Sequence, residues 1–414
     1  MRLPSLLIVV FLACSACATI LQNGQVRDVH FPNTTIVLDD DDRNSTWRTY
    51  PPNATEIGYK GRWDSKHISW WSAPGLKFAF TGDRLAISFG QHTSPGVLIG
   101  YRLDGQDWQF TNVTANSTNL LVTPATPGFN LTTSRTRTFE LRVTNWSLGV
   151  QIANIHVSRA ANGTLVGLPL APRTLEIIGD SLSAGQYATY EGLASYAWDL
   201  AAGLGGAEFS ITAYPGICLV DAPCWGNARG QRRQWRYASD TSARAARLYG
   251  ADHAAAEPWD FAARPPADVV VVNLGTNDNN TANDVGGPAA FLAAYVALVA
   301  DVHDVWPDAQ VVLVSLWNGF GPVGSSWAQG GAFVDEIQEV ARRYESEGFV
   351  HYFNTTGIMQ HNDIGPQWHP TDVGALKLAS HLMQFIKIKF DWDLLATGPE
   401  IQHETLYWND QANY

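Results

Sequence analysis

The sequence is short of cysteine and of basic residues, and both shortages narrow what the protein can be. Only four of its 414 residues are cysteine. Lys and Arg number 27 against 39 Asp and Glu, so the formal net charge is −12. The basic residues cluster only at Arg232, Arg233 and Arg236. Because nucleic acids and anionic membranes are bound through concentrated positive charge, the composition argues against both as partners.

Long apolar runs are scarce as well. Arg2, a short apolar stretch over residues 6–13 and small residues at 16–18 form the pattern of a cleaved secretory signal. That stretch is too short to span a bilayer, and we expect no later stretch to be long enough. We therefore predict a signal peptide over residues 1–18 and a secreted, extracellular mature chain. A lipoprotein signal at Cys14 or Cys17 is the less favoured alternative.

Removal of the signal leaves two cysteines, Cys218 and Cys224. Two cysteines six residues apart in an oxidising compartment are expected to form one disulfide, which closes a small loop. A structural metal site needs four ligands, and no second His or Cys pair lies nearby in the sequence. We therefore expect a disulfide here and no metal.

Ten Asn-x-Ser/Thr sequons indicate a glycosylated secreted protein, and eight of them precede residue 165. The alternative is that strands and turns rich in Thr and Asn produce some of these triplets by chance. The ten asparagines are Asn33, Asn44, Asn53, Asn112, Asn116, Asn130, Asn145, Asn162, Asn279 and Asn354.

The chain divides into two regions of different patterning. Short alternating apolar segments separated by turn residues fill residues 31–165, which predicts an all-β sandwich resembling a jelly roll. Residues 159–173 lack a period and contain two prolines and two glycines, so we interpret them as a linker. A tail over 391–414 follows the second region.

The second region, residues 174–390, alternates apolar strands with helical patterns. Strands are expected at 175–178, 209–213, 268–274, 310–316 and 349–353, and helices at 192–204, 288–305, 331–345 and 371–388. This order predicts a parallel sheet covered by helices on both faces, with its active site at the carboxyl ends of the strands. The polar segment 224–261 is either an insertion that walls the site or an ordinary pair of surface helices.

A possible nucleophile lies where the first of these strands ends, in Gly179-Asp180-Ser181. Small residues let the chain turn sharply from strand to helix and expose a serine hydroxyl. A serine needs a base to remove its proton, and the chain has eleven histidines. Local sequence alone does not single out one of His351, His361 and His369, although a Pro and a helix follow His369.

Three further blocks accompany this serine in a fixed order: Tyr214-Pro215-Gly216, Gly275-Thr276-Asn277-Asp278 and Trp368-His369-Pro370-Thr371. Together the four blocks resemble those of the SGNH (GDSL-type) hydrolase superfamily. The strand-rich N-terminal region and the Trp-His-Pro-Thr block are similar to carbohydrate esterase family two, which includes acetylxylan esterases.

The resemblance implies a flavodoxin-like three-layer α/β domain, with Ser181 as nucleophile and His369 as base. It also implies an oxyanion hole formed by the backbone N–H groups of Ser181 and Gly216 and by the side-chain amide of Asn277. No metal ion or organic cofactor is required.

One part of the family pattern is absent. An aspartate usually stands two or three residues before the histidine and holds its ring, but here those positions are Gln367 and Pro366. We expect a Ser-His dyad in which a backbone carbonyl orients the ring. The Asp363 carboxylate and the Gln367 side-chain oxygen are the alternatives.

The function that the resemblance implies is removal of O-acetyl groups from plant cell-wall polysaccharides of the acetylxylan or glucomannan type. Four residues beside the motif-bearing strands are candidates for a sugar platform, although each could equally be wall packing: Trp225, Trp317, Asn318 and Trp368. The alternatives are an esterase for lipid or aryl esters and a carbohydrate-binding protein without catalysis. The sequence does not indicate an oligomeric state.

Overall fold

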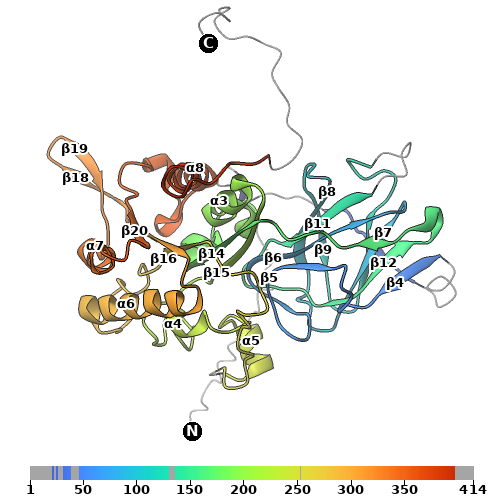
Figure 1. Ribbon diagram of the computed structural model, residues 1–414, viewed down its shortest axis with the longest axis horizontal. Coiled ribbons are helices and arrows are strands. Elements are labelled where there is room, and N and C mark those ends of the chain that lie inside the picture. Colours follow the sequence, from blue (N-terminus) through green and yellow to red (C-terminus); the bar gives the residue numbers. More distant parts are fainter. Residues whose placement is uncertain are drawn as a thin grey trace, which may run out of the picture.

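The fold is taken from a computed structural model that describes residues 21–22, 25–26, 31–38, 46–129, 136–251 and 253–396. The expected signal peptide, the sequons at Asn44 and Asn130 and the tail beyond residue 396 lie outside the described residues. Two bodies stand side by side in Figure 1, a helix-covered sheet and a β-sandwich.

A parallel sheet forms the centre of the helix-rich body. Its strand order is β20-β17-β16-β14-β15, and every neighbouring pair is parallel. The strands are β14 (Arg173–Gly179), β15 (Ala207–Ala213), β16 (Val269–Asn273), β17 (Gln310–Val314) and β20 (Val350–Phe353). All five strands expected from the apolar runs are confirmed.

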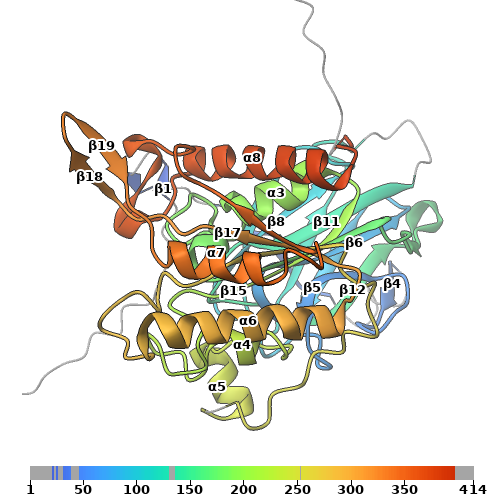
Figure 2. The same ribbon diagram turned by 60° about the vertical axis from the view of Figure 1, so that its left-hand side comes forward.

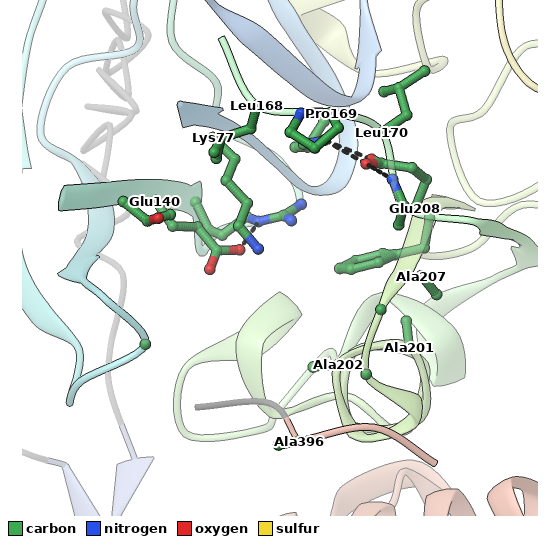
Figure 3. Close-up of a pocket in the computed structure, with 18 of the residues that line it drawn as sticks. Lys77, Glu140, Leu168, Pro169, Leu170, Ala201, Ala202, Ala207, Glu208 and Ala396 are labelled. Atoms are coloured by element: carbon green, nitrogen blue, oxygen red, sulfur yellow. Dashed lines mark hydrogen bonds and ion pairs between the residues drawn. The ribbon is translucent and has the colours of Figure 1, made fainter. Parts of the chain in front are cut away.

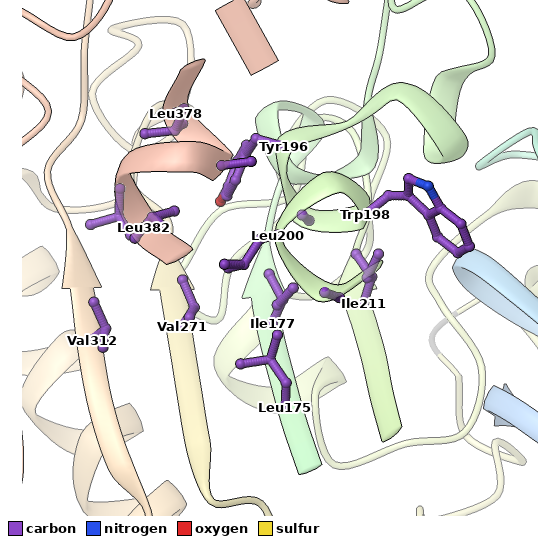
Figure 4. Packing of buried hydrophobic residues seen from close by; sticks show 14 of the residues in the cluster. Leu175, Ile177, Tyr196, Trp198, Leu200, Ile211, Val271, Val312, Leu378 and Leu382 are labelled. Carbon is purple, nitrogen blue, oxygen red and sulfur yellow. The ribbon is translucent and has the colours of Figure 1, made fainter. Parts of the chain in front are cut away.

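Helices cover both faces of this sheet, because alternate strand residues point to opposite sides. Leu175, Ile177 and Val271 join the core under α3 (Tyr196–Leu204) and α8 (Asp372–Phe390), as Figure 4 shows. Ile178, Val270 and Val272 join the core under α6 (Gly287–Val305) and α7 (Val334–Arg343). In Figure 2, α8 and α6 lie on opposite sides of the strands.

Short elements complete this body. They are α2 (Ser181–Ala184), α4 (Gln231–Gln234), α5 (Ala243–Tyr249), the hairpin of β18 (Phe320–Val323) and β19 (Ser326–Gln329), and three 3-10 turns, η2 (Glu191–Ala194), η3 (His361–Asp363) and η4 (Pro366–Trp368).

The N-terminal body consists of two sheets packed on a shared apolar core of Phe, Leu, Ile and Val side chains. One sheet has the order β3-β10-β7-β12-β4, with β3 (Thr35–Ile36), β4 (Trp47–Tyr50), β7 (Leu85–Phe89), β10 (Thr118–Val122) and β12 (Ile152–Ser158). The other contains β5 (Gly58–Trp63), β6 (Ser69–Phe80), β8 (Val97–Leu103), β9 (Gln109–Val113) and β11 (Arg137–Val143). A separate pair is β1 (Leu21–Gln22) with β2 (Gln25–Val26).

Strand β6 joins the two bodies into one sheet. Its end near Ser72 pairs with Ile211 of β15, whereas residues 75–80 pair with β11. Trp71 and Ala73, on either side of Ser72, have positive φ values of 65° and 51°, which lie outside the β region. The segment expected to be a linker also takes part, because β13 (Leu165–Val166) pairs with β6.

Helix α6 differs from one sequence-based expectation. By length and composition alone it is long and apolar enough to cross a membrane. In the fold, its residues Phe291, Tyr295, Leu298 and Val302 are buried against the sheet. Its apolar character is accounted for by a place in the core.

Candidate active site

The nucleophile candidate, Ser181, lies in a tight turn between β14 and α2. Asp180 caps the helix, and its carboxylate accepts a hydrogen bond from the Leu182 N–H at 2.9 Å. A side chain at Gly179 would lie 2.1 Å from the Ser183 Oγ, so this turn requires glycine. Ser181 is the first helical residue, a position whose N–H has no partner within its own helix.

His369 follows η4 and precedes α8, and its ring is fixed by the backbone. Its Nδ1 lies 3.1 Å from the Pro366 carbonyl oxygen and 3.0 Å from that of Gln367. Because carbonyl oxygens only accept, Nδ1 carries the proton and Nε2 is left with a free lone pair. Nε2 is buried and has no hydrogen-bond partner among the described residues. Burial lowers the pKa of His369, although the two carbonyl hydrogen bonds act in the opposite direction.

The carbonyl geometry depends on an unusual backbone. Gln367 and Trp368 both have positive φ, at 52° and 63°. Such conformations are costly for residues other than glycine, and they turn the Gln367 carbonyl toward the ring.

Neither side-chain alternative for orienting the ring applies in the structure. The Gln367 side-chain oxygen accepts a 3.4 Å hydrogen bond from the Tyr187 hydroxyl instead. Asp363 is fully buried, and its Oδ2 accepts from Lys377 at 2.7 Å and from the Gln360 N–H at 2.8 Å. The backbone takes the place of the missing aspartate.

Besides the Ser181 N–H, the expected oxyanion donors lie on two neighbouring loops. Gly216 has φ 77°, and a side chain there would come within 2.8 Å of the Trp225 Cβ. The Asn277 amide donates to the Ile217 carbonyl at 3.0 Å and lies 3.4 Å from the Asp180 carboxylate. This places the Asn277 side chain between the nucleophile turn and the Gly216 loop.

Buried carboxylates hold these loops in place. Asp278 accepts from the N–H groups of Leu219 at 2.8 Å and Val220 at 3.0 Å. Burial raises the pKa of Asp278, and burial aided by the nearby Asp278 raises the pKa of Asp180 to about 7.

The structure forms the expected disulfide between Cys218 and Cys224. It closes the loop directly after Gly216. The Asn227 side chain then donates to the Pro215 carbonyl at 3.1 Å, which ties the end of this loop to its beginning.

One cavity of about 890 Å³ brings these groups together. Its lining includes Ser181, Gly216, Asn277 and His369 with two exposed tryptophans, Trp225 and Trp368. The other two candidates for a sugar platform are not in the lining. Trp317 is 1% exposed and donates through its indole N–H to the Trp368 carbonyl. The Asn318 amide donates to the Gly331 carbonyl.

One wall of this cavity was not predicted from the sequence. Trp146, from the loop after β11 in the N-terminal body, lines it and packs edge to face on Tyr214 with ring centroids 5.6 Å apart. Its only sequence signal is the Asn145-Trp146-Ser147 sequon, which gives no indication of an approach to the other body.

The described sequons differ in exposure. Seven asparagines are exposed, and Asn279 also lines the active-site cavity. Asn145 is 6% exposed, and its amide donates to Glu191 at 2.9 Å, so the structure argues against a glycan there. The exposed seven are Asn33, Asn53, Asn112, Asn116, Asn162, Asn279 and Asn354.

A second cavity, of about 640 Å³, contains none of these groups (Figure 3). Lys77 and Glu140 reach it from the sandwich, and Glu208 and Ala202 from the other body. Most of its charges are already paired, as in the contact of Glu140 with Arg142 at 3.0 Å. It is therefore not the candidate site.

Comparison with known proteins gives matches to the part of the chain that carries these site residues. Residues 177–376 match the profile of the GDSL-like Lipase/Acylhydrolase family. A curated relative, the cellulase/esterase CelE of Acetivibrio thermocellus, is 29% identical over 138 residues, which is 32% of this chain and 16% of that protein.

Three solved structures share the fold of both bodies. A family two carbohydrate esterase from Clostridium thermocellum in complex with cellohexaose has a TM-score of 0.62 and 24% identity, covering 81% of this chain and 99% of that one. A carbohydrate esterase family 2 enzyme of Corynascus thermopiles has a TM-score of 0.64 and 22% identity, covering 81% of this chain and 100% of that one. The acetyl xylan esterase Est2A of Butyrivibrio proteoclasticus has a TM-score of 0.64 and 17% identity, covering 84% of this chain and 100% of that one.

Proposed function

Residues 177–376 belong to the GDSL-like lipase/acylhydrolase family, whose members act on carboxylic esters, and from this we propose that the protein removes O-acetyl groups from plant cell-wall polysaccharides. One observation carries the catalytic part of the proposal. Ser181 and His369 line one cavity, with the Nδ1–H of His369 fixed by carbonyl groups and its Nε2 left to accept a proton. We further propose that the chain is secreted and glycosylated.

In the proposed mechanism the Ser181 Oγ attacks the acetyl carbonyl carbon while the His369 Nε2 takes the hydroxyl proton. The tetrahedral intermediate then collapses, and the sugar oxygen leaves with the proton from His369. Water attacks the acetyl-serine next, again giving a proton to His369. This second intermediate collapses, His369 returns its proton to the Ser181 oxygen, and acetic acid departs and loses its proton to solvent as acetate, so the enzyme is regenerated without a cofactor.

The surroundings of the dyad suit each charge that develops. The negative charge on the former carbonyl oxygen would be met by the Ser181 and Gly216 N–H groups and the Asn277 amide. Such preorganised donors typically contribute a few kcal/mol each. The two carbonyl oxygens at Nδ1 stabilise the imidazolium as it forms, which is the part usually played by a carboxylate.

Support for a sugar substrate comes from the cavity rim and from the relatives. Trp225 and Trp368 are 57% and 48% exposed, which is high for tryptophan, and aromatic faces suit the apolar faces of sugar rings. The structure from Clostridium thermocellum is in complex with cellohexaose, and Est2A is named an acetyl xylan esterase.

The absence of an aspartate before His369 would favour a binding protein without catalysis, because a base whose ring is not oriented works poorly. The carbonyl groups of Pro366 and Gln367 supply what that aspartate would provide, so this alternative loses its principal support.

The test compares substrates with the purified protein. Acetate release from acetylated xylan and acetylated glucomannan is measured beside hydrolysis of 4-nitrophenyl esters from acetyl to octanoyl. We expect acetate release from at least one polysaccharide and a steep fall in rate beyond the acetyl ester. A preference for octanoyl esters would instead support a lipid esterase, and polysaccharide binding with no ester hydrolysis would support a binding protein.

A further inference from the structure

The loop that follows β11 reaches from the sandwich into the active-site cavity. Trp146 at its tip is half-buried and lines that cavity. Its partner Tyr214 stands two residues before Gly216, so Trp146 forms the wall beside the Gly216 loop. Trp368 stands on the other motif-bearing segment, next to His369.

The loop has a fixed internal shape. The Asn145 side-chain oxygen accepts hydrogen bonds from the Ser147 N–H at 2.8 Å, the Ser147 hydroxyl at 2.7 Å and the Leu148 N–H at 2.9 Å. Asparagine often folds loops in this way, by accepting from backbone groups two and three residues ahead. Trp146 therefore projects from a loop that its own neighbours hold in shape.

Glu191, at the start of η2, attaches this loop to the hydrolase body. One carboxylate oxygen accepts from the Asn145 amide at 2.9 Å, and the other accepts from the Trp146 N–H at 3.3 Å. Next to it, the Gly192 N–H donates to the Thr144 carbonyl at 2.9 Å. Three hydrogen bonds thus fix the backbone of Trp146 relative to the segment after the nucleophile turn, because α2 ends at Ala184, seven residues before Glu191.

The backbone around Glu191 is shaped for this contact. Glu191 has φ 46°, a strained value for a residue other than glycine. A side chain at Gly192 would lie 3.0 Å from the Thr144 carbonyl oxygen, which is close enough to push the loop away. Strained backbone conformations of this kind persist only where the surrounding structure enforces them, and they are concentrated at functional sites.

We propose that Trp146 contacts the sugar unit that bears the acetyl group, and that Glu191 is the residue that positions it. The inference rests on the proposed polysaccharide esterase function and assigns the sandwich a part in substrate recognition. An aromatic wall there adds contact with the sugar while leaving the reacting ester to Ser181 and His369. Its loss is expected to affect a small aryl ester less than an acetylated oligosaccharide, because the aryl ester has no sugar ring or further sugar units for this wall to bind.

The test measures kcat/KM for an acetylated xylooligosaccharide and for 4-nitrophenyl acetate. Trp146→Ala is expected to lower the value for the oligosaccharide by about tenfold or more, mainly through KM, with less than about threefold change for the aryl ester. Trp146→Phe, which keeps an aromatic ring, is expected to recover most of the loss. The matched control is Trp108→Ala, which removes another tryptophan of the sandwich that packs on the hydrolase body, against Trp198, but is not in the cavity lining.

Glu191→Gln tests the positioning role. It replaces one accepting oxygen by a donor, and we expect the same selective rise in KM, smaller than that of Trp146→Ala. In the Trp146→Ala background the Glu191→Gln change is expected to have little further effect on oligosaccharide KM. Fully additive effects would contradict the positioning role.

Two results would overturn the inference in different ways. Equal losses on both substrates in Trp146→Ala, or no loss on either, would exclude sugar contact while the esterase function stands. A wild-type protein that hydrolyses 4-nitrophenyl acetate but no acetylated oligosaccharide would overturn the proposed substrate class, and the sugar contact with it.

Discussion

The Nδ1–H of His369 donates to the backbone carbonyl of Gln367 at 3.0 Å. This contact accounts for how a histidine without a nearby aspartate keeps the tautomer that a general base needs. It also makes the conformation of Gln367, rather than its side chain, the feature on which orientation of the base depends.

Substitutions at Gln367 are expected to separate backbone from side chain. Gln367→Gly accepts a φ of 52° without strain and should keep kcat within about threefold of wild type. Gln367→Pro forces φ to about −65°, turns the carbonyl away and should lower kcat by at least about tenfold. Steady-state kinetics on 4-nitrophenyl acetate, with circular dichroism to check folding, measures the kcat of both variants. An inactive glycine variant would implicate the side chain instead.

Asn277→Ala is expected to lower kcat by about 10²- to 10³-fold, because it removes a donor that stabilises the oxyanion. KM should change little if the donor acts mainly in the transition state. Asn354→Ala removes an exposed amide that is not in the lining of the active-site cavity and serves as the control, with wild-type kinetics expected. A loss confined to KM in Asn277→Ala would mean that this amide binds the ground state instead.

The pH profile should reflect the buried base. Burial lowers the pKa of His369, and only its neutral form can accept the proton from Ser181. The acid limb of kcat/KM, which reports the free enzyme, is therefore expected to have its midpoint below pH 6.5. A midpoint above pH 6.5 would show that the imidazolium is stabilised in the free enzyme, contrary to the buried site described above.

Stability should also depend on pH through buried carboxyl groups. Burial raises the pKa of both Asp180 and Glu191 to about 7, and burial with the nearby Asp372 raises that of Asp199 to about 7. A raised pKa in the folded state contributes stability that is complete below the unfolded value of about 4 and is lost as pH rises toward 7. We therefore expect Tm to fall between about pH 4 and pH 7.

A thermal melt series from pH 4 to pH 7 measures this fall, and Asp199→Asn is the informative variant because the neutral amide does not titrate. It should flatten part of the decline. An Asp199→Asn curve parallel to that of wild type would mean that Asp199 is ionised in the folded protein throughout this range.

Much of the fold could be predicted because strands of a parallel sheet are buried on both faces and therefore have continuous apolar sequences. Residues 269–272 are four valines in succession, and alternate members are buried against opposite helix layers. The pairing of Ser72 with Ile211, which joins the two bodies, could not be predicted. The spacing of apolar residues indicates where a strand lies, but it does not indicate which strand of another sheet pairs with it.

The candidate site could likewise be predicted only in part. Ser181, Gly216, Asn277 and His369 stand in recognisable blocks that end strands or begin helices, and the structure gathers them around one cavity. Trp317 could not be told apart from Trp368 in the sequence, because burial in the core is set by packing between distant segments.

Ser181 and His369 are proposed to carry out ester hydrolysis together. Acetate release from acetylated xylan or glucomannan by Ser181→Ala and His369→Ala, beside wild type, tests this proposal most directly. We predict that wild type releases acetate and that each variant loses at least about 10³-fold in kcat while keeping its Tm within a few degrees. Retention of more than about a tenth of wild-type activity by either variant would contradict the dyad.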